Sequence, residues 1–216
     1  FKRDLQIDLE EAQPGVTILE VNGFLVRGSG RVDDIKLSDS IIAENSTIYE
    51  DAEDGTTMGW QVYDDIPAGA NINNVYDNDR NSRVIEFTGS DTSNGYRLRN
   101  ADGSKWHNTS QFIIEWSMRY SEDFTVYIDV ETSNGHRYIY YTPADYEGLG
   151  NGEYVHHGIG SSVIDGQWHT FKRDLQIDLE EAQPGVTILE VNGFLVRGSG
   201  RVDDIKLSDS IIAENS

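Results

Sequence analysis

Short stretches of alternating apolar and polar residues, separated by clusters of glycine, asparagine and aspartate, run through most of this chain. Alternation with a period of two is typical of strands that bury one face. The clearest such stretch begins at Phe124, and its two faces differ in character. Its apolar face holds Phe124, Val126, Ile128 and Val130, and its other face holds Tyr127, Asp129 and Glu131.

A tight hairpin is predicted directly after this strand, because Asn134-Gly135 suits the two positive-φ positions of a two-residue turn. Counting outward from that turn places Asp129 opposite Tyr140 and Glu131 opposite Tyr138. The polar face of the hairpin therefore gathers carboxylates and tyrosines. Its members are Tyr127, Asp129, Glu131, Tyr138 and Tyr140.

The remaining elements complete an all-β pattern. Residues 112–120 alternate like a strand and turn Arg119 outward, so Arg119 joins the polar face if this strand neighbours the hairpin. Residues 173–182 carry apolar side chains at helical spacing and end before a Pro-Gly pair, which predicts a short crossing helix. Residues 188–196 and 202–207 return to alternation. Many short strands with one helix predict a β-sandwich.

The chain contains an exact internal repeat. Residues 1–46 recur without a substitution as residues 171–216, which lie 170 positions further on. We therefore expect residues 47–216 to be one complete β-sandwich unit and residues 1–46 to be the C-terminal part of a preceding identical unit. The body, residues 47–170, could be completed by either copy. The surplus copy is expected to be ordered by β-pairing, in its twin's slot or against a neighbouring molecule.

Composition excludes several classes of partner. The chain has 17 Lys and Arg against 38 Asp and Glu, a net charge of -21, which repels nucleic acid and anionic membrane surfaces. No apolar run is long enough to span a bilayer. The absence of cysteine rules out disulfides, thiolate metal sites and cysteine nucleophiles.

Three short motifs resemble the carbohydrate-binding jelly rolls that are appended to bacterial xylanases and cellulases. Residues 49–55, followed by Gly59-Trp60, resemble the opening of that fold, and residues 198–205 resemble its closing strand. Residues 165–169 look like a strand entry shared by many lectin-like sandwiches. The resemblance implies a jelly-roll sandwich that binds polysaccharide without catalysis and is secreted or displayed on a bacterial cell surface.

The same resemblance implies a structural calcium ion where the opening and closing strands meet. Carried over by motif, its ligands are Glu50, Asp51 and Asp204, and oxygen donors of this kind suit calcium. Asp33 and Asp34 repeat the closing motif and become candidates only if the first copy fills the slot. The alternative is that these carboxylates are solvated charges that discourage edge-to-edge strand pairing.

A catalytic interpretation of the hairpin is weaker. Residues 127–131 look like the catalytic strand of lectin-fold endoglucanases, but Tyr127 stands where that pattern has its nucleophile. His156 and His157 are adjacent and point to opposite faces of a strand, so they do not jointly hold one metal ion. No phosphate-binding loop or nucleophile elbow is found. We therefore predict that the chain is not an enzyme.

Two functions stay open. In the first, the polar face of the hairpin binds a glycan, because tyrosine rings stack on sugars while Asp129, Glu131 and Arg119 bind hydroxyls; Trp106 is a second exposed aromatic candidate. The competing interpretation is that cross-strand aromatic pairs only stabilise an exposed sheet, or that the loop of residues 142–152 covers them. In the second function, the unit is a structural repeat of a surface fibre or adhesin, assembled through strand exchange between copies of itself at residues 1–46 or 171–216.

Overall fold

A computed structural model describes residues 5, 9, 12–13, 18, 21, 23–29 and 45–209. The chain divides into two compact units, Phe1–Ala43 and Glu44–Ser216. In the described part of the first unit, Phe24, Leu25 and Val26 are exposed and no residue is assigned to a strand. The predicted β-pairing of residues 1–46 otherwise falls outside the described residues, as do Asp33 and Asp34.

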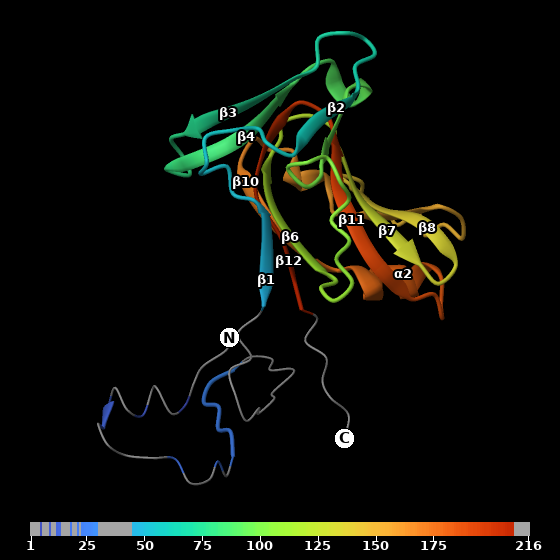
Figure 1. Ribbon diagram of the computed structural model, residues 1–216. Coiled ribbons are helices and arrows are strands. Elements are labelled where there is room, and N and C mark those ends of the chain that lie inside the picture. Colours follow the sequence, from blue (N-terminus) through green and yellow to red (C-terminus); the bar gives the residue numbers. More distant parts are fainter. Residues whose placement is uncertain are drawn as a thin grey trace. The chain divides into compact units, whose positions relative to one another are not determined.

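The described part of the second unit is a two-layer β-sandwich of jelly-roll type with one short α-helix, which confirms the predicted fold class (Figure 1). Its strands are β1 (Ser46–Glu50), β2 (Trp60–Asp64), β3 (Asn71–Asp77), β4 (Ser82–Thr88), β5 (Gly95–Leu98), β6 (Ile113–Arg119), β7 (Thr125–Thr132), β8 (Gly135–Thr142), β9 (Tyr154–Gly158), β10 (Trp168–Asp174), β11 (Ile188–Arg197) and β12 (Gly200–Ser208). The helices are α2 (Leu175–Ala182) and two 3₁₀ turns, η1 (Asp91–Ser93) and η2 (Ser161–Val163).

Each layer has six strands. The first sheet has the order β10-β6-β12-β4-β3, with β1 also paired to β12, and the second sheet has the order β2-β5-β11-β7-β8-β9. Strands β11 and β12 therefore lie in the interiors of the two sheets, although they are the last two strands in sequence. No helix in the described residues is both long and apolar enough to cross a membrane.

The core lies between the sheets and is filled by the inward residues of each strand. The apolar face predicted for the hairpin is confirmed, because Val126, Ile128 and Val130 are fully buried. Trp116 on the first sheet packs against Tyr141 and Phe194 on the second, with ring centroids 5.3 and 6.2 Å apart. These contacts hold the sheets together, so the outer face of the second sheet is supported from beneath.

The predicted hairpin register is wrong by two residues. The structure pairs Asp129 with Tyr138 and Thr132 with Gly135. Gly135 adopts a φ of 83°, whereas Asn134 does not have a positive φ, so the turn lacks the two left-handed residues that the predicted type requires. A shift of two preserves the alternation of faces, and the predicted faces therefore stand.

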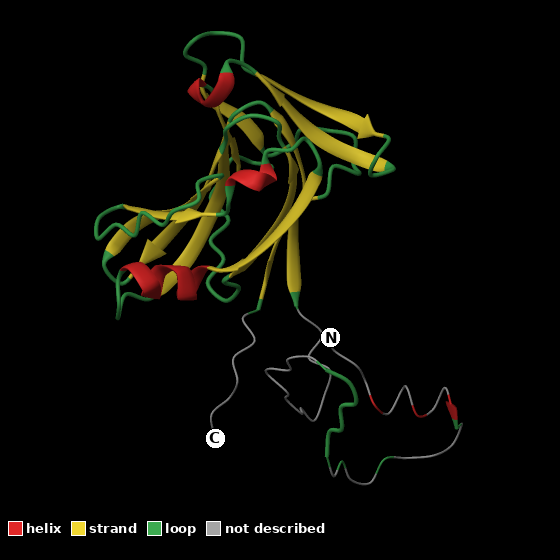
Figure 2. Ribbon diagram, turned by 180° about the vertical axis from the view of Figure 1, so that it is seen from behind, coloured by secondary structure: helices red, strands yellow, loops and turns green. Residues whose placement is uncertain are grey.

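The predicted crossing helix is confirmed as α2, which begins two residues later than expected. Asp174 caps its first turn by accepting hydrogen bonds from the backbone N–H groups of Gln176 and Ile177. The helix, the longest red coil in Figure 2, contacts β8, β9, β10 and β11. Asp178 on it accepts a 2.6 Å hydrogen bond from the hydroxyl of Tyr141.

Strand β9 pairs with β8 in parallel, and the chain between them, residues 143–153, returns alongside β9. Gly148 donates a 3.2 Å hydrogen bond from its backbone N–H to the carbonyl of His156, and Gly160 donates one of 3.0 Å to Ala144. A Cβ at Gly158 would lie 2.4 Å from the carbonyl oxygen of Tyr146, so the loop packs directly on the strand. The loop therefore covers the outer edge of the second sheet.

Strand β12 contains an irregularity at Asp203 and Asp204. Its first residues pair with β4, and its last residues, from Ile205 onward, pair with β1. Asp204 adopts a φ of 52° at this changeover. The acidic pair of the closing motif thus lies at the point where one neighbouring strand replaces another.

Candidate functional site

The outer face of the second sheet is the surface on which the chemistry-bearing side chains gather. One row of outward residues crosses all six strands at the same level. In order from β2 to β9 it consists of Gln61, Arg97, Leu195, Tyr127, Tyr140 and His156. The row is polar and cationic at the β2 end, apolar in the middle and aromatic at the β9 end. We call this surface, together with the parallel row described next, the outer face.

The second row contains a fixed polar cluster. Arg99, which follows β5, lies across Gly193 of β11 and pairs with Asp129 of β7, with 3.0 Å between Arg99 Nη2 and Asp129 Oδ2. His136 lies 3.0 Å from the other oxygen of Asp129 through Nε2, and its Nδ1 is 3.0 Å from Glu153. Asp129 is only 2% exposed. Its carboxylate therefore orients Arg99 and His136 instead of facing solvent.

Gly193 permits this arrangement. A Cβ on this residue would lie 3.0 Å from the carbonyl oxygen of Leu98 and 3.3 Å from Nε of Arg99. Both distances are shorter than ordinary van der Waals contacts, so a side chain here would push the Arg99 side chain off the sheet. The glycine therefore lets the guanidinium lie flat and reach Asp129.

The aromatic half of the outer face is a network of rings. Tyr127 stacks on Tyr140 with centroids 5.3 Å apart, and Tyr138 stacks on Tyr154 with centroids 5.6 Å apart. Tyr154 is 50% exposed, whereas Tyr138 is half-buried. Burial raises the pKa of Tyr127, Tyr138 and Tyr140 above the usual tyrosine value, so their hydroxyls stay protonated at neutral pH. The network offers ring surface together with hydroxyl donors.

The five hairpin residues predicted to share a face do share it, and Glu131 lies opposite His136. Sequence reasoning missed Arg99, His136 and Tyr154. Tyr154 belongs to a strand that reaches β8 through a parallel connection, which local alternation does not reveal. The alternation of Tyr154 and His156 was the available signal, and the predicted opposite orientation of His156 and His157 is confirmed: His156 bonds Thr142 and His157 bonds Asp178.

Two predicted residues lie elsewhere. Arg119 is on β6, in the first sheet, where it binds Asp79 and the carbonyl of Gly166, each at 2.6 Å. It misses the outer face because β6 pairs with β10 and β12, not with the hairpin. Trp106 is 7% exposed and stacks on Tyr49 with centroids 3.7 Å apart, so it is buried and not a surface aromatic.

The predicted calcium ligands already have hydrogen-bond partners within the protein. Glu50 accepts hydrogen bonds of 2.7 Å from the backbone N–H of Ala52 and 2.6 Å from the indole of Trp60. Asp51 accepts a 3.2 Å bond from the backbone N–H of Glu53. Burial raises the pKa of Glu50 to about 7, so this carboxyl group gives up its proton reluctantly in the fold.

Arg80 supplies positive charge at the closing motif. Its Nε lies 2.9 Å from Asp203, and its Nη2 pairs with Asp204. These groups line an open pocket of about 470 Å³ together with Asp51 and Glu53. Burial, followed by repulsion from Asp204, raises the pKa of Asp203 to about 6. An ion at the predicted calcium position would therefore compete with a guanidinium.

One group of three possible metal ligands occurs among the described residues. His157, Asp178 and Glu181 bring one ligand atom each to within 4.8 Å of one another. His157 is fully buried and lies 3.0 Å from the backbone carbonyl of Asp178 through Nε2 and 3.1 Å from Glu147 through Nδ1. The Asp178 carboxylate is bound by Arg173 and Tyr141. This group already has protein partners, which a metal ion would have to replace.

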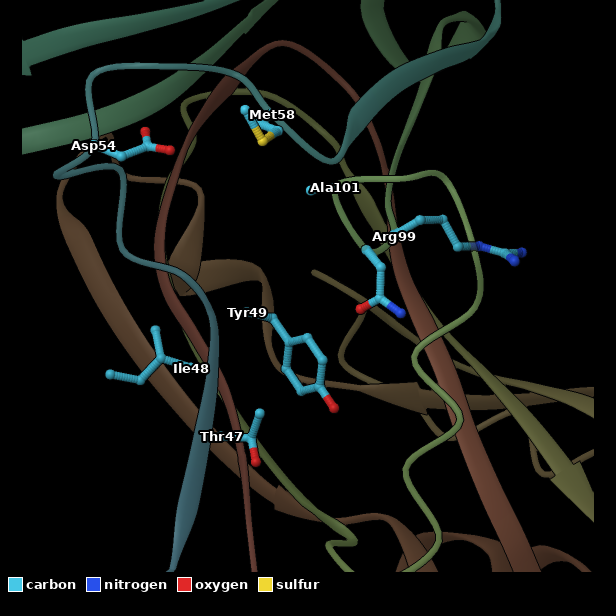
Figure 3. A pocket seen from close by; sticks show the side chains of 8 residues that line it. Thr47, Ile48, Tyr49, Asp54, Met58, Arg99 and Ala101 are labelled. Carbon is cyan, nitrogen blue, oxygen red and sulfur yellow. The ribbon is translucent and has the colours of Figure 1, made fainter.

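A shallow pocket of about 330 Å³ lies beside β1, between Tyr49 and the turn that follows β5 (Figure 3). Thr47 donates its hydroxyl to Gln111, and the Tyr49 hydroxyl accepts from Asn108. The Arg99 guanidinium points away from the pocket, toward the outer face (Figure 3). The Thr47 and Tyr49 hydroxyls are thus already bound to residues outside the pocket lining, so this pocket is a weaker candidate than the outer face.

Comparison with known proteins gives one family. The family model described as the β-sandwich domain of D-glucuronyl C5-epimerase matches residues 81–190, just over half of the 216 residues. No curated protein matches the chain.

Solved structures with a similar fold include carbohydrate-binding modules. A family 11 module from Clostridium thermocellum, in complex with a β-1,3-1,4-mixed-linked tetrasaccharide, is 15% identical with a TM-score of 0.45, over 76% of this chain and 96% of that one. CBM27-1 from Caldicellulosiruptor saccharolyticus, in complex with mannohexaose, is 12% identical with a TM-score of 0.41, over 76% of this chain and 96% of that one.

Proposed function

This chain belongs to the family of D-glucuronyl C5-epimerase β-sandwich domains, and we propose that it is a non-catalytic module that binds a polysaccharide on the outer face. The observation that carries the proposal is the juxtaposition of stacked tyrosines with a fixed cluster of Arg99, Asp129 and His136 on one open sheet. The family takes its name from an enzyme whose substrate unit, a glucuronyl residue, is a sugar.

The chemistry of the outer face suits a sugar chain. Tyrosine rings present apolar surface to the C–H faces of pyranoses, and their hydroxyls bind sugar hydroxyls. Arg99 is already oriented by Asp129, so little side-chain entropy is lost when a ligand binds to it. The exposed or partly exposed residues Gln61, Arg97, Tyr138 and Tyr154 lie on four different strands of the outer face, which leaves room for an extended chain, unlike a closed pocket.

The same cluster argues against catalysis on this face. A general acid or nucleophile must reach the reacting bond. Asp129 is 2% exposed, and its two oxygens are bound by Arg99 and His136. Glu131 is the remaining acid of the pair, and Tyr127 stands where the catalytic pattern of lectin-fold endoglucanases has its nucleophile. We therefore propose binding without bond cleavage.

The charge of the chain shapes its preference. With a net charge of -21, the protein repels strongly anionic polymers, so a neutral or weakly charged glycan is the better ligand. The proposal places the module outside the cell, secreted or on a bacterial surface, where polysaccharides occur. Structural calcium remains part of the proposal, at Glu50, Asp51 and Asp204, subject to the competition with Arg80.

The test is binding to a panel of immobilised polysaccharides, with affinity measured by calorimetry for each hit. Replacing Tyr138 or Tyr154 by alanine should weaken binding about five- to tenfold, since an aromatic contact contributes about 1 kcal/mol beyond the area it buries. Tyr76→Ala is the matched control, because Tyr76 is also about half exposed but lies on β3 of the first sheet. Unchanged binding in both outer-face variants would remove this surface from consideration.

A further inference from the structure

The last part of the sandwich occupies a slot in the rest of it. Residues 171–208 supply most of β10 together with α2, β11 and β12. Strand β11 inserts between β5 and β7, and β12 inserts between β6 on one side and β4 and β1 on the other. The body that precedes residue 171 therefore lacks the interior strand of both sheets and cannot close its core by itself.

The sequence provides this segment twice, because residues 1–38 are identical to residues 171–208. We propose that residues 1–38 also fit the slot, within the same chain, so that one body has two interchangeable occupants. The chain then has two folded arrangements, which we call frames. In the first frame residues 171–208 fill the slot, as in the described structure, and in the second frame residues 1–38 fill it.

The pairing of β1 with β12 makes the second frame geometrically simple. Ser46 pairs with Ser208, and the backbone N–H of Asp209 donates a 3.1 Å hydrogen bond to the carbonyl of Asn45. Ser38 and Asp39 are the counterparts of Ser208 and Asp209. In the second frame the segment would run directly into β1 through residues 40–44, and a loop of about five residues is an ordinary hairpin connection.

In the second frame the body and the first copy also meet within β10, where the strand is interrupted between Thr170 and Phe1. An interruption costs least at this position. Phe1 is the counterpart of Phe171, which lies within β10, so in the second frame Trp168 and its two successors come from the body and the rest of β10 comes from the first copy. Strand β10 is the edge strand of the first sheet. A break there interrupts one ladder with β6 and leaves both interior strands whole.

The slot cannot distinguish the two copies by side chain. It buries Phe194, Val196 and Leu207 completely, and their counterparts are Phe24, Val26 and Leu37. Pairs between slot and segment, such as Glu115 with Lys206 at 2.8 Å, are available to either copy. The connections between segment and body, including the break in β10, then set the occupancy, and in either frame one copy is displaced.

Cysteine cross-linking reports which copy lies beside β1. Ile48 of β1 is directly opposite Lys206, whose counterpart is Lys36, and the chain has no cysteine of its own. We expect two full-length variants, Ile48→Cys/Lys206→Cys and Ile48→Cys/Lys36→Cys, each to form an intramolecular disulfide under mild oxidation. Absence of the 36–48 cross-link, or its formation only between molecules, would overturn the proposal.

Chance collisions are controlled with Ile48→Cys/Arg31→Cys. Arg31 is the counterpart of Arg201, which lies beside Glu86 of β4 and far along β12 from the residues that pair with β1. A structureless tether would cross-link positions 31 and 36 to 48 within about a factor of two of each other. If residues 1–38 occupy the slot, position 36 should cross-link to position 48 and position 31 should hardly do so. Equal yields of the two cross-links would refute the proposal.

Damage to one copy should transfer occupancy to the other. Phe194→Asp places a carboxylate in the core and should disfavour the C-terminal copy by about a hundredfold or more. In that background the 36–48 cross-link should approach completion while the sandwich stays folded. Phe24→Asp alone should abolish the 36–48 cross-link without loss of fold, and the double variant should unfold. If Phe194→Asp unfolds the chain as completely as the double variant does, residues 1–38 do not enter the slot.

Discussion

The buried carboxyl of Glu50 gives a prediction in which the sign and size follow from the structure. Burial is the main cause that raises its pKa to about 7, from the 4.5 that is usual for a glutamate side chain. A group with a raised pKa binds its proton more tightly in the fold, so its stabilising contribution is complete below the unfolded pKa and is lost as pH rises through about 7. The protein should therefore become more stable as pH falls from 8.5.

The magnitude follows from proton linkage. Between pH 8.5 and 5.5, Glu50 should add about 2 kcal/mol to the free energy of unfolding. Asp203, with its pKa raised to about 6, adds a further ~1 kcal/mol over the same interval. His156 acts in the opposite direction below its usual range, because burial lowers its pKa.

The variant Glu50→Gln isolates the effect. It removes the titrating group, while Asp203 and His156 stay the same, so their contributions cancel in the difference between the two proteins. Urea denaturation, followed by tryptophan fluorescence at constant ionic strength, would measure unfolding free energies from pH 8.5 to 5.5. The gap between wild type and Glu50→Gln should change by about 2 kcal/mol across that interval, in favour of the wild type at the lower pH. Parallel curves would refute the assignment.

Two further predictions concern the paired arginines. Arg99→Ala should lower the free energy of unfolding by about 3 kcal/mol, because it leaves the buried Asp129 with His136 alone. The control Arg97→Ala removes a contact to Gln61 only and should lower it by less than about 1 kcal/mol. Equal losses in urea denaturation would contradict this prediction. In the Arg80→Ala variant, Asp203 and Asp204 lose their guanidinium partner, so addition of calcium should raise the melting temperature of the variant, while the wild type responds little. A calcium response of equal size in both proteins would show that calcium does not compete with Arg80.

The face assignments followed from sequence because they depend only on alternation. The hairpin register was wrong by an even number of residues, so Tyr127, Asp129 and Tyr138 still fell on one side. The helix was found from apolar spacing, and its start at Leu175 reflects the cap at Asp174. Local pattern was sufficient for each of these features.

Strand order could not be predicted in the same way. Arg119 and Trp106 were assigned by exposure and alternation alone, but which sheet receives β6 and what covers an indole are set by pairing between distant segments. The same holds for Arg80, which comes from the β3–β4 turn to meet the closing motif more than a hundred residues later. A motif can indicate the residues of a site, but it does not show that the guanidinium of Arg80 already binds them.

The parallel pairing of β9 has a consequence for any array of such units. A bare strand at the edge of a sheet is a template for another chain, and identical repeats would bring many such templates close together. Here the return loop lies against that edge, because Gly148 bonds His156 and Ala144 accepts a hydrogen bond from Gly160. The length of residues 143–153 is therefore constrained by the strand that the loop must shield, and a shortened loop would leave β9 free to pair with the same strand of another copy.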